Sequence, residues 1–230
     1  MSEFFVSSAY FGVVLSIGAF LVGRALQKRF KHPLCNPLLI AIVLVILFLL
    51  VFDVDYESYQ SSAKYLSYLL TPATVCLAIP LYEQFELLKK NVKAVLAGIV
   101  SGVLSSLCCV LVLALLFHLD HASYVTFLPK SITTAIGMGV SEQLGGHVSI
   151  TVAIIIITGV IGNMIAESVC RAFHITEPIA RGIAIGTASH AIGTTRAMEL
   201  GEVEGAMSSL SIVVAGVLTV AGASVFSLLL

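Results

Sequence analysis

The sequence predicts an all-α polytopic membrane protein with about seven spans, one re-entrant hairpin and an inverted repeat of three-helix units containing broken helices. Hydrophobic residues make up 58% of the 230 residues and charged residues only 11%, about half the charged fraction of a soluble domain. Several uncharged runs are long enough to cross the hydrocarbon core of a bilayer. Polar and charged residues interrupt the apolar pattern in the second half of the chain. The net charge of −1 gives no sign of nucleic-acid binding, and no basic cluster suggests it.

The first two expected spans are Phe4–Gly23 and Leu34–Phe52, which are both uncharged. The loop between them holds the densest positive cluster of the chain, formed by Arg24, Lys28, Arg29 and Lys31. The positive-inside rule therefore places this loop in the cytoplasm and the N-terminus outside. The first ten residues contain no basic residue, so Phe4–Gly23 is expected to be a retained span and not a cleaved signal peptide.

The third expected span, Tyr65–Tyr82, is interrupted at Thr71-Pro72 and again at Pro80. Proline removes a backbone donor and clashes with the preceding turn, so we expect a helix break at Thr71 and Pro72. A simple kink and a break that lines a substrate site both fit this pattern. Ala94–Phe117 then returns outward with a face of small residues, namely Gly98, Ser101, Gly102, Ser105 and Ser106.

Two apolar pieces follow that are each too short to cross a bilayer, Ala122–Leu128 and Ile132–Val140. We interpret them as a re-entrant hairpin whose turn is Pro129-Lys130-Ser131. Free backbone donors at the start of the second piece, together with hydroxyl groups, suit an anion. The binding residues predicted here are Lys130, Ser131, Thr133 and Thr134. The alternative is a surface loop with a snorkelling lysine.

The last three expected helices are Val148–Ala166, Gly182–Thr195 and Gly205–Leu230, and the last one ends in the cytoplasm. Asn163 is expected either to join two helices or to contribute to the site. The middle helix is expected to be discontinuous between Thr187 and Gly193, because this interval and the preceding Gly186 bring glycines and hydroxyls into an apolar segment.

The chain is expected to be one transmembrane domain, residues 1–230, in which a first repeat at 34–117 recurs in inverted form at 148–230. The offset is about half the chain, and the opposite orientation follows from the charges that flank each run. Inverted repeats with broken helices are typical of secondary transporters, whose sites lie where the breaks meet.

Around the second break we predict a binding site for a small organic anion. His190 lies in an otherwise uncharged stretch and is a candidate for proton coupling together with Glu199, or it is a neutral hydrogen-bonded core residue. Arg196 offers a fork suited to a carboxylate, or it pairs with Glu199 or Glu202 on the same helix. The hydroxyl ligands predicted here are those of Thr187, Ser189 and Thr194.

No metal or cofactor is predicted. The five cysteines show no CxxC spacing, and His118, Asp120 and His121 are more typical of a solvated loop than of a metal site. An enzyme is not expected, because the side chains of adjacent helical residues such as Ser189 and His190 point about 100° apart, which is poor geometry for a nucleophile and its base.

Two stretches carry a resemblance to a known family: PKSITTAIGMGVSEQLGG at 129–146 and EPIARGIAIGTASHAIGTTRAMELGEVEGAMSSL at 177–210. They closely resemble the LrgB/CidB family, and the whole chain is similar to its short inner-membrane members of the YohK type. The family pattern matches the chain at Pro129, Lys130, Ser131, Thr133, Thr134, Glu142, Gly186, Thr187, Ser189, His190, Gly193, Thr194, Arg196, Glu199, Gly201, Glu202 and Glu204. The chain departs from the pattern at Ala135, where many members have proline.

The resemblance implies a multi-pass protein of the bacterial inner membrane and two possible activities. The first is secondary transport of small monocarboxylates of the glycolate, glycerate and pyruvate class, with proton coupling. The second is holin- or antiholin-like modulation of murein hydrolase activity and autolysis, together with a small LrgA/CidA-type membrane protein. We also expect a homo-oligomer.

Overall fold

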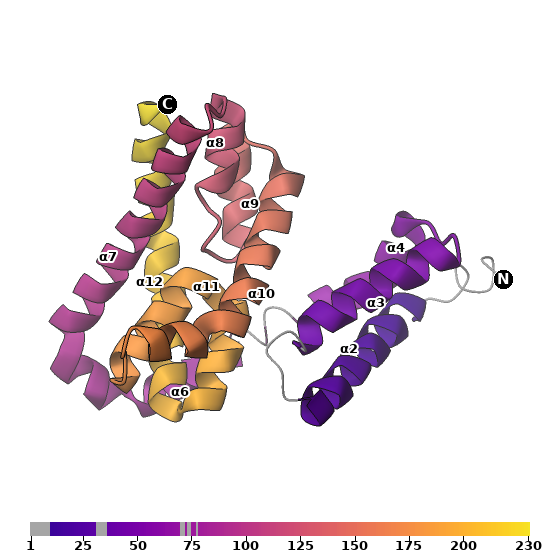
Figure 1. The fold of residues 1–230 in the computed structure, drawn as a ribbon, viewed down its shortest axis with the longest axis horizontal. Coiled ribbons are helices and arrows are strands. Elements are labelled where there is room, and N and C mark those ends of the chain that lie inside the picture. The colour runs from indigo at the N-terminus through magenta and orange to yellow at the C-terminus, as the bar shows by residue number, and fades with distance from the viewer. Residues whose placement is uncertain (1–9, 31–35, 70–71, 73–74, 77) are drawn as a thin grey trace. The chain divides into compact units, whose positions relative to one another are not determined.

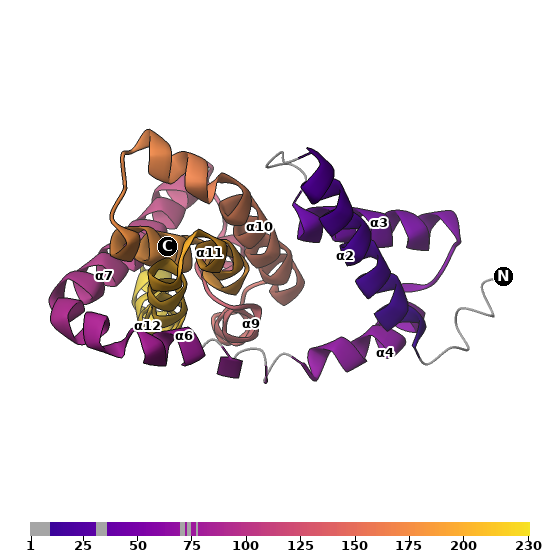
Figure 2. The same cartoon turned by 90° about the horizontal axis from the view of Figure 1, so that it is seen from below.

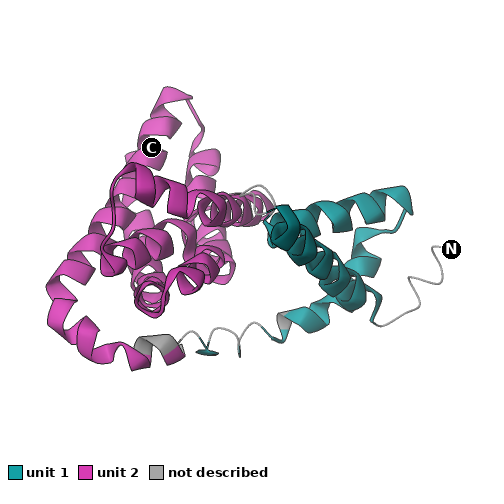
Figure 3. Cartoon of the chain, turned by 60° about the horizontal axis from the view of Figure 1, so that its bottom comes forward, with its two compact units in different colours: residues 1–76 teal, residues 77–230 magenta. Residues whose placement is uncertain are grey.

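The computed structural model describes residues 10–30, 36–69, 72, 75–76 and 78–230, and these residues contain helices and turns without a strand. The chain divides into two compact units, Met1–Cys76 and Leu77–Leu230 (Figure 3). The predicted single domain and the first repeat at 34–117, which crosses this division, stay predictions.

The helices of the first unit whose bounds lie among the described residues are α2 (Phe11–Phe30), α3 (Pro37–Val51) and α4 (Tyr56–Ser67). The side chain of Asn36 caps the start of α3 by accepting from the backbone N–H groups of Leu38 and Leu39, and Pro37 fits the first helical position. Helix α2 packs against both other helices (Figure 2). It approaches α4 closely at Gly12, whose N–H donates to Ser62 Oγ at 2.8 Å.

The second unit holds the remaining helices that the structure describes (Figure 1). They are α6 (Ala78–Glu83), α7 (Phe85–Leu116), α8 (His121–Phe127), α9 (Thr134–Gln143), α10 (Val148–Ala172), α11 (Pro178–Leu200), α12 (Glu202–Phe226) and the 3-10 helix η1 (Ser227–Leu229).

Four of the described helices are long and apolar enough to cross a membrane: α2, α7, α10 and the continuous helix Glu202–Leu229. Helix α3 is apolar but shorter. The protein is therefore an all-helical, multi-pass membrane protein. The inverted repeat and the total number of spans stay predictions, but Gly182–Thr195 is not one of the spans, because α11 reverses at His190.

The predicted third span, Tyr65–Tyr82, falls on parts of two helices, since α4 ends at Ser67 and α6 begins at Ala78. Thr71 lies outside the described residues. Pro72 is helical, but the residues on both sides of it lie outside the described part of the chain. The predicted break at Thr71-Pro72 therefore stays a prediction.

Helix α7 forms one wall of the second unit. Its buried residues recur at helical spacing along one face, at Val95, Ile99, Val103, Leu107, Val110 and Ala114. They belong to a core cluster that includes Met207, Ala215 and Ala223 of α12. Val92, Leu96 and Leu104 are exposed elsewhere on α7, as expected of a helix in contact with lipid.

Helices α8 and α9 are the two short pieces expected from the sequence, with 7 and 10 residues, and the turn between them includes Pro129-Lys130-Ser131. Thr151 of α10 holds this pair in place. Its hydroxyl donates to Thr126 O at 3.0 Å and to Ser141 Oγ at 2.7 Å. The pair thus has the form of a hairpin, and neither helix is long enough to cross a bilayer.

Helix α11 contains a break within the expected interval Thr187–Gly193. His190 has φ 42° and ψ −141°, a conformation rare for a residue other than glycine. Before the break, Ile183 faces Gly98 of α7 and Thr187 faces Gly102, so that residue numbers rise in the same direction along both helices. Gly186 and Gly193 are themselves helical and buried.

After the break the chain runs back along α10. His190 contacts Ile155, Ile192 contacts Asn163, and Arg196 contacts Glu167. These three pairs advance toward the C-terminal end of α10. Helix α11 is therefore a hairpin with its tip at His190, and both of its ends lie at the end of the unit that carries Arg171. We call Pro178–Ser189 its first arm and Ala191–Leu200 its second arm.

This reversal corrects the predicted course of the last two helices. As one of the seven expected spans, Gly182–Thr195 would cross the membrane, so that α12 would begin at the end of the unit opposite to Arg181 and finish at the end that carries Arg181. Instead, Glu204 pairs with Arg181 at 3.4 Å, and at the other end Tyr124 of α8 donates to Phe226 O at 2.9 Å. Figure 1 shows the C-terminal end of α12 beside α8. The C-terminus therefore lies at the end opposite to Arg181, because the helix before α12 does not cross.

Candidate functional site

Two hairpins meet inside the second unit, one from each end. Helix α9 packs on α10 and α12, where Ile136 faces Gly216. The α11 hairpin packs on the same two helices, with Gly186 against Ser208. Ile155 of α10 touches both hairpins, because its side chain lies at Gly137 and its carbonyl contacts His190.

The chain reversals of both hairpins thus lie at mid-length of α10. Helix α9 and the second arm of α11 both begin there, so the positive ends of two helix dipoles lie near the middle of the unit. Helix starts of this kind favour negatively charged groups.

A cavity of about 760 Å³ lies between α7 and the first arm of α11. Its lining residues are Asn91, Ala94, Gly98, Ser101, Gly102, Ser105, Ser106, Lys130, Ser131, Glu177, Ile179, Ala180, Ile183, Ala184, Thr187 and Ala188. Asn91 and Glu177 mark the end near the start of both helices, and Lys130, Ser106 and Thr187 mark the inner end, at the turn between α8 and α9. Lys130 and Glu177 are the charged side chains in this lining.

The inner end combines one cation with several hydroxyl groups. Lys130 Nζ donates to Ser131 Oγ at 2.9 Å, and Ser131 Oγ lies 3.2 Å from Ser106 Oγ. Thr187 is 5% exposed, and its buried hydroxyl has no hydrogen-bond partner. A buried hydroxyl without a partner is unfavourable by about 1–3 kcal/mol. A bound oxygen-rich anion would supply the missing acceptor.

Three of the predicted ligands hold the tip of the hairpin and are absent from the cavity lining. His190 is 2% exposed, and its Nε2 lies 3.0 Å from Ile155 O. Ser189 packs closely against Gly162: a Cβ atom added at Gly162 would lie 2.6 Å from Ser189 Cβ. The hydroxyl of Thr194 donates to His190 O at 2.9 Å and lies 2.7 Å from Ser208 Oγ. Their predicted role in binding stays a prediction.

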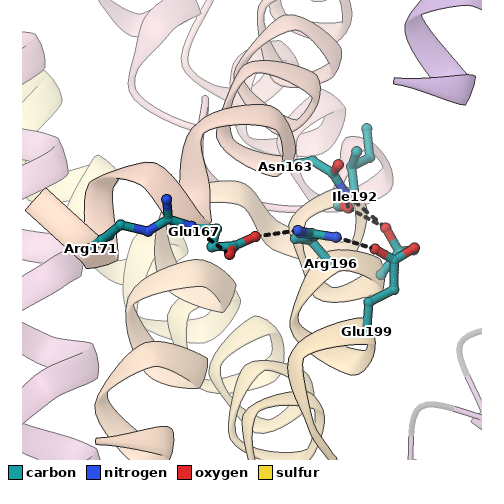
Figure 4. A network of polar contacts seen from close by, with 7 residues as sticks. Asn163, Glu167, Arg171, Ile192, Arg196 and Glu199 are labelled. Carbon is teal, nitrogen blue, oxygen red and sulfur yellow. Dashed lines mark hydrogen bonds and ion pairs between the residues drawn. The ribbon is translucent and has the colours of Figure 1, made fainter. Parts of the chain in front are cut away.

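Arg196 lies in a network of ion pairs between α10 and the second arm of α11 (Figure 4). It pairs with Glu167 of α10 and, at 2.6 Å, with Glu199. Glu167 also pairs with Arg171 at 2.9 Å. Of the two alternatives for Arg196, the pairing with Glu199 is the arrangement that the structure contains. Asn163 joins the same two helices by donating to Ile192 O at 2.8 Å and to Thr195 Oγ1 at 2.9 Å.

The remaining predicted residues lie close to the turn. Thr133 occupies the N-cap position of α9 without a side-chain capping bond, and Thr134 begins the helix. Both are half-buried and lie outside the cavity lining. Pro129 is buried in the turn. Of the predicted binding residues, the cavity therefore brings together Lys130, Ser131 and Thr187.

Sequence reasoning did not select the polar residues of α7 that line the cavity, which are Asn91, Ser101, Ser105 and Ser106. The signal was present, because these serines form one helical stripe with Gly98 and Gly102. It was interpreted only as a packing face. Among the described residues, no group of three or more His, Cys, Asp or Glu side chains forms a metal site.

Comparison with known proteins assigns the family. Residues 16–229 match the LrgB-like family. The antiholin-like protein LrgB of Bacillus cereus (strain B4264) is 41% identical over 212 residues, which cover 92% of each chain. The antiholin-like protein LrgB of Bacillus anthracis (strain A0248) shows the same identity and coverage. No solved structure matches the chain. With a match across nearly its whole length and this level of identity to its relatives, the chain belongs to the LrgB-like family.

Proposed function

We propose that the protein is a secondary transporter of small monocarboxylate anions, of the glycolate, glycerate and pyruvate class, in the bacterial inner membrane. The observation that carries this proposal is the inner end of the cavity. There a single lysine and an unpaired buried hydroxyl lie where two opposed hairpins meet. Discontinuous helices whose N-termini point at an anion are a recurrent feature of secondary transporters.

The chemistry of the cavity favours a singly charged, short substrate. One carboxylate would accept hydrogen bonds from Lys130 Nζ and Thr187 Oγ1, and the hydroxyls of Ser106 and Ser131 would be available to a hydroxyl or keto oxygen beside it. Lys130 balances one negative charge, and Glu177 near the opposite end of the lining disfavours a second. Alanine and glycine form much of the remaining wall, which suits a small organic group.

Proton coupling is part of this proposal and would use His190, a buried titratable side chain at the tip of the α11 hairpin. Glu199 supports this role less well, because it is more than half exposed and already paired with Arg196.

A second candidate function is antiholin-like modulation of autolysis together with a small LrgA/CidA-type membrane protein. The names of the relatives favour it, since the similar Bacillus proteins are called antiholin-like. This function requires no saturable substrate site, whereas transport does.

Uptake into liposomes separates the two functions. The purified protein, reconstituted without a partner, should take up labelled pyruvate or glycolate with saturation. Lys130→Met should lower uptake at subsaturating substrate at least tenfold, because the charge-assisted hydrogen bond it removes is worth about 1.5–3 kcal/mol. Lys93→Met, which removes an exposed lysine of α7 outside the cavity lining, is the matched control.

Uptake that does not saturate, or that requires a partner protein, would exclude transport by this chain alone and favour the antiholin-like function. Equal uptake by the Lys130→Met and Lys93→Met variants would contradict the assignment of the site.

A further inference from the structure

The α11 hairpin is bound very differently on its two sides. Its second arm and tip are joined to α10 by the contacts of Arg196 with Glu167, Asn163 with Ile192 and Thr195, and His190 with Ile155. Towards α12, the hairpin is joined by Arg181 with Glu204 and Thr194 with Ser208. These contacts fix the hairpin to α10 and α12 at its base, along its arms and at its tip.

The side of the hairpin that faces α7 has no such contacts. Within the described part of the chain, no hydrogen bond or ion pair joins α7 to α11. The contact includes Ile183 and Thr187, which pack against two glycines: a Cβ atom would lie 3.2 Å from Ile183 Cγ2 at Gly98 and 2.6 Å from Thr187 Cγ2 at Gly102. The cavity lies in the same interface, and Ile183 also belongs to the apolar core cluster that includes Val95 and Ile99 of α7.

This difference has a mechanical consequence. A hydrogen bond or ion pair holds two helices in one register, because its strength falls steeply with distance and angle. Contacts between side chains and glycine lack this directionality and give a smooth surface along which two helices can separate or slide. In a membrane, water does not compete for the buried polar contacts of His190 with α10 and of Thr194 with α12.

We propose that the interface between α7 and the first arm of α11 opens and closes during transport by a pivot of α7 on its apolar contact with α12, while α10, both arms of α11 and α12 move as one body. We call this interface the seam and define it by Gly98, Gly102, Ile183 and Thr187. The inference rests on the proposed transport function, because it assigns the movement that would carry the substrate past the inner end of the cavity. Separation at the seam would open the cavity without breaking any polar contact of the hairpin.

Disulfide crosslinking tests the seam. The five natural cysteines, Cys35, Cys76, Cys108, Cys109 and Cys170, are first replaced by alanine. The seam pair is Gly98→Cys with Ile183→Cys. The matched control pair joins the hairpin to α12 through Met198→Cys and Gly205→Cys, because a Cβ at Gly205 would lie 3.6 Å from that of Met198, a suitable distance for a disulfide.

Each protein is compared with itself, oxidised against reduced, so that any effect of the substitutions alone cancels. Oxidation of the seam pair should lower uptake at least tenfold, and reductant should restore it. Oxidation of the control pair should leave uptake within twofold of that of the same protein in its reduced form. Full uptake with the seam crosslinked, shown by mass spectrometry, would overturn the proposal, and so would an equal loss in both pairs.

A second measurement does not depend on uptake and therefore separates a failure of the seam from a failure of the transport function. Spin labels replace exposed residues at Leu104 of α7, Ile161 of α10 and Val213 of α12. The distribution of distances between the two labels of each pair is measured with and without pyruvate. For labels 104 and 161, the distance should change with pyruvate or show two populations. For labels 161 and 213, one population should be found at the same distance in both conditions. A single unchanged distance for both pairs would refute the seam even in a protein that transports.

Discussion

The unpaired hydroxyl of Thr187 allows a prediction in which stability and binding change in opposite directions. Thr187→Val keeps the shape of the side chain and removes a buried hydroxyl that has no partner in the empty protein. Since such a group is unfavourable by about 1–3 kcal/mol, the free energy of unfolding without substrate should rise by a similar amount. The same substitution removes a hydrogen bond to the bound carboxylate, worth about 1.5–3 kcal/mol. The dissociation constant should therefore rise about ten- to hundredfold.

Thr194→Val is the matched control, because that hydroxyl is also buried but is bonded to His190 O and lies against Ser208 Oγ. Its loss leaves these groups without their partner, so the free energy of unfolding should fall by about 1–3 kcal/mol. Thermal unfolding of the purified proteins in detergent, with pyruvate or glycolate titrated, measures both quantities. The reasoning is refuted if Thr187→Val melts at a lower temperature than the parent protein and binds the carboxylate equally well.

Two further substitutions test the roles assigned to the hairpin contacts. Arg196→Gln should leave the apparent KM for uptake within twofold of the parent value. It should lower the free energy of unfolding by about 1–2 kcal/mol, since the ion pairs that it removes are part-exposed. Uptake kinetics and thermal unfolding measure these two quantities, and a tenfold higher KM would make Arg196 a substrate ligand. Gly162→Ala should lower the free energy of unfolding by about 1–3 kcal/mol, because its methyl group would overlap the side chain of Ser189. Gly139→Ala has open space around its Cβ and should be neutral or stabilising by up to about 1 kcal/mol; equal melting temperatures for the two alanine variants would contradict the close packing at Gly162.

The features that sequence reasoning anticipated are those set by length and by local chemistry. The hairpin around Pro129-Lys130-Ser131 was predictable because its two apolar pieces are too short to cross a bilayer. The break near His190 was predictable from glycines and hydroxyls in an apolar segment. At the turn between α8 and α9, a cation and hydroxyl groups beside a helix start predicted an anion site. Lys130 and Ser131 of this turn do line the cavity.

The direction of α12 could not be predicted in the same way. Hydropathy and flanking charge identify a broken helix, but they do not say whether the chain continues across or turns back, and the left-handed backbone of His190 decides this. For a related reason, the sequence indicated Glu199 as a possible partner of Arg196 but could not indicate Glu167. Glu167 is 29 residues away from Arg196, and only the return of the second arm along α10 brings the two together. Ser106 was missed because a stripe of glycine and serine has the same pattern in a packing face as in a cavity wall.

The shortness of α9 has a consequence for how the membrane voltage would act on the protein. Its ten residues span about 15 Å, about half of a typical hydrocarbon core, while the cavity extends from Lys130 through the other half to Asn91 and Glu177. An electric field falls mainly across the part of a barrier that excludes water and ions. An anion held at Lys130 would therefore experience most of the membrane potential over the length of α9 alone, where each 100 mV corresponds to about 2.3 kcal/mol for one elementary charge.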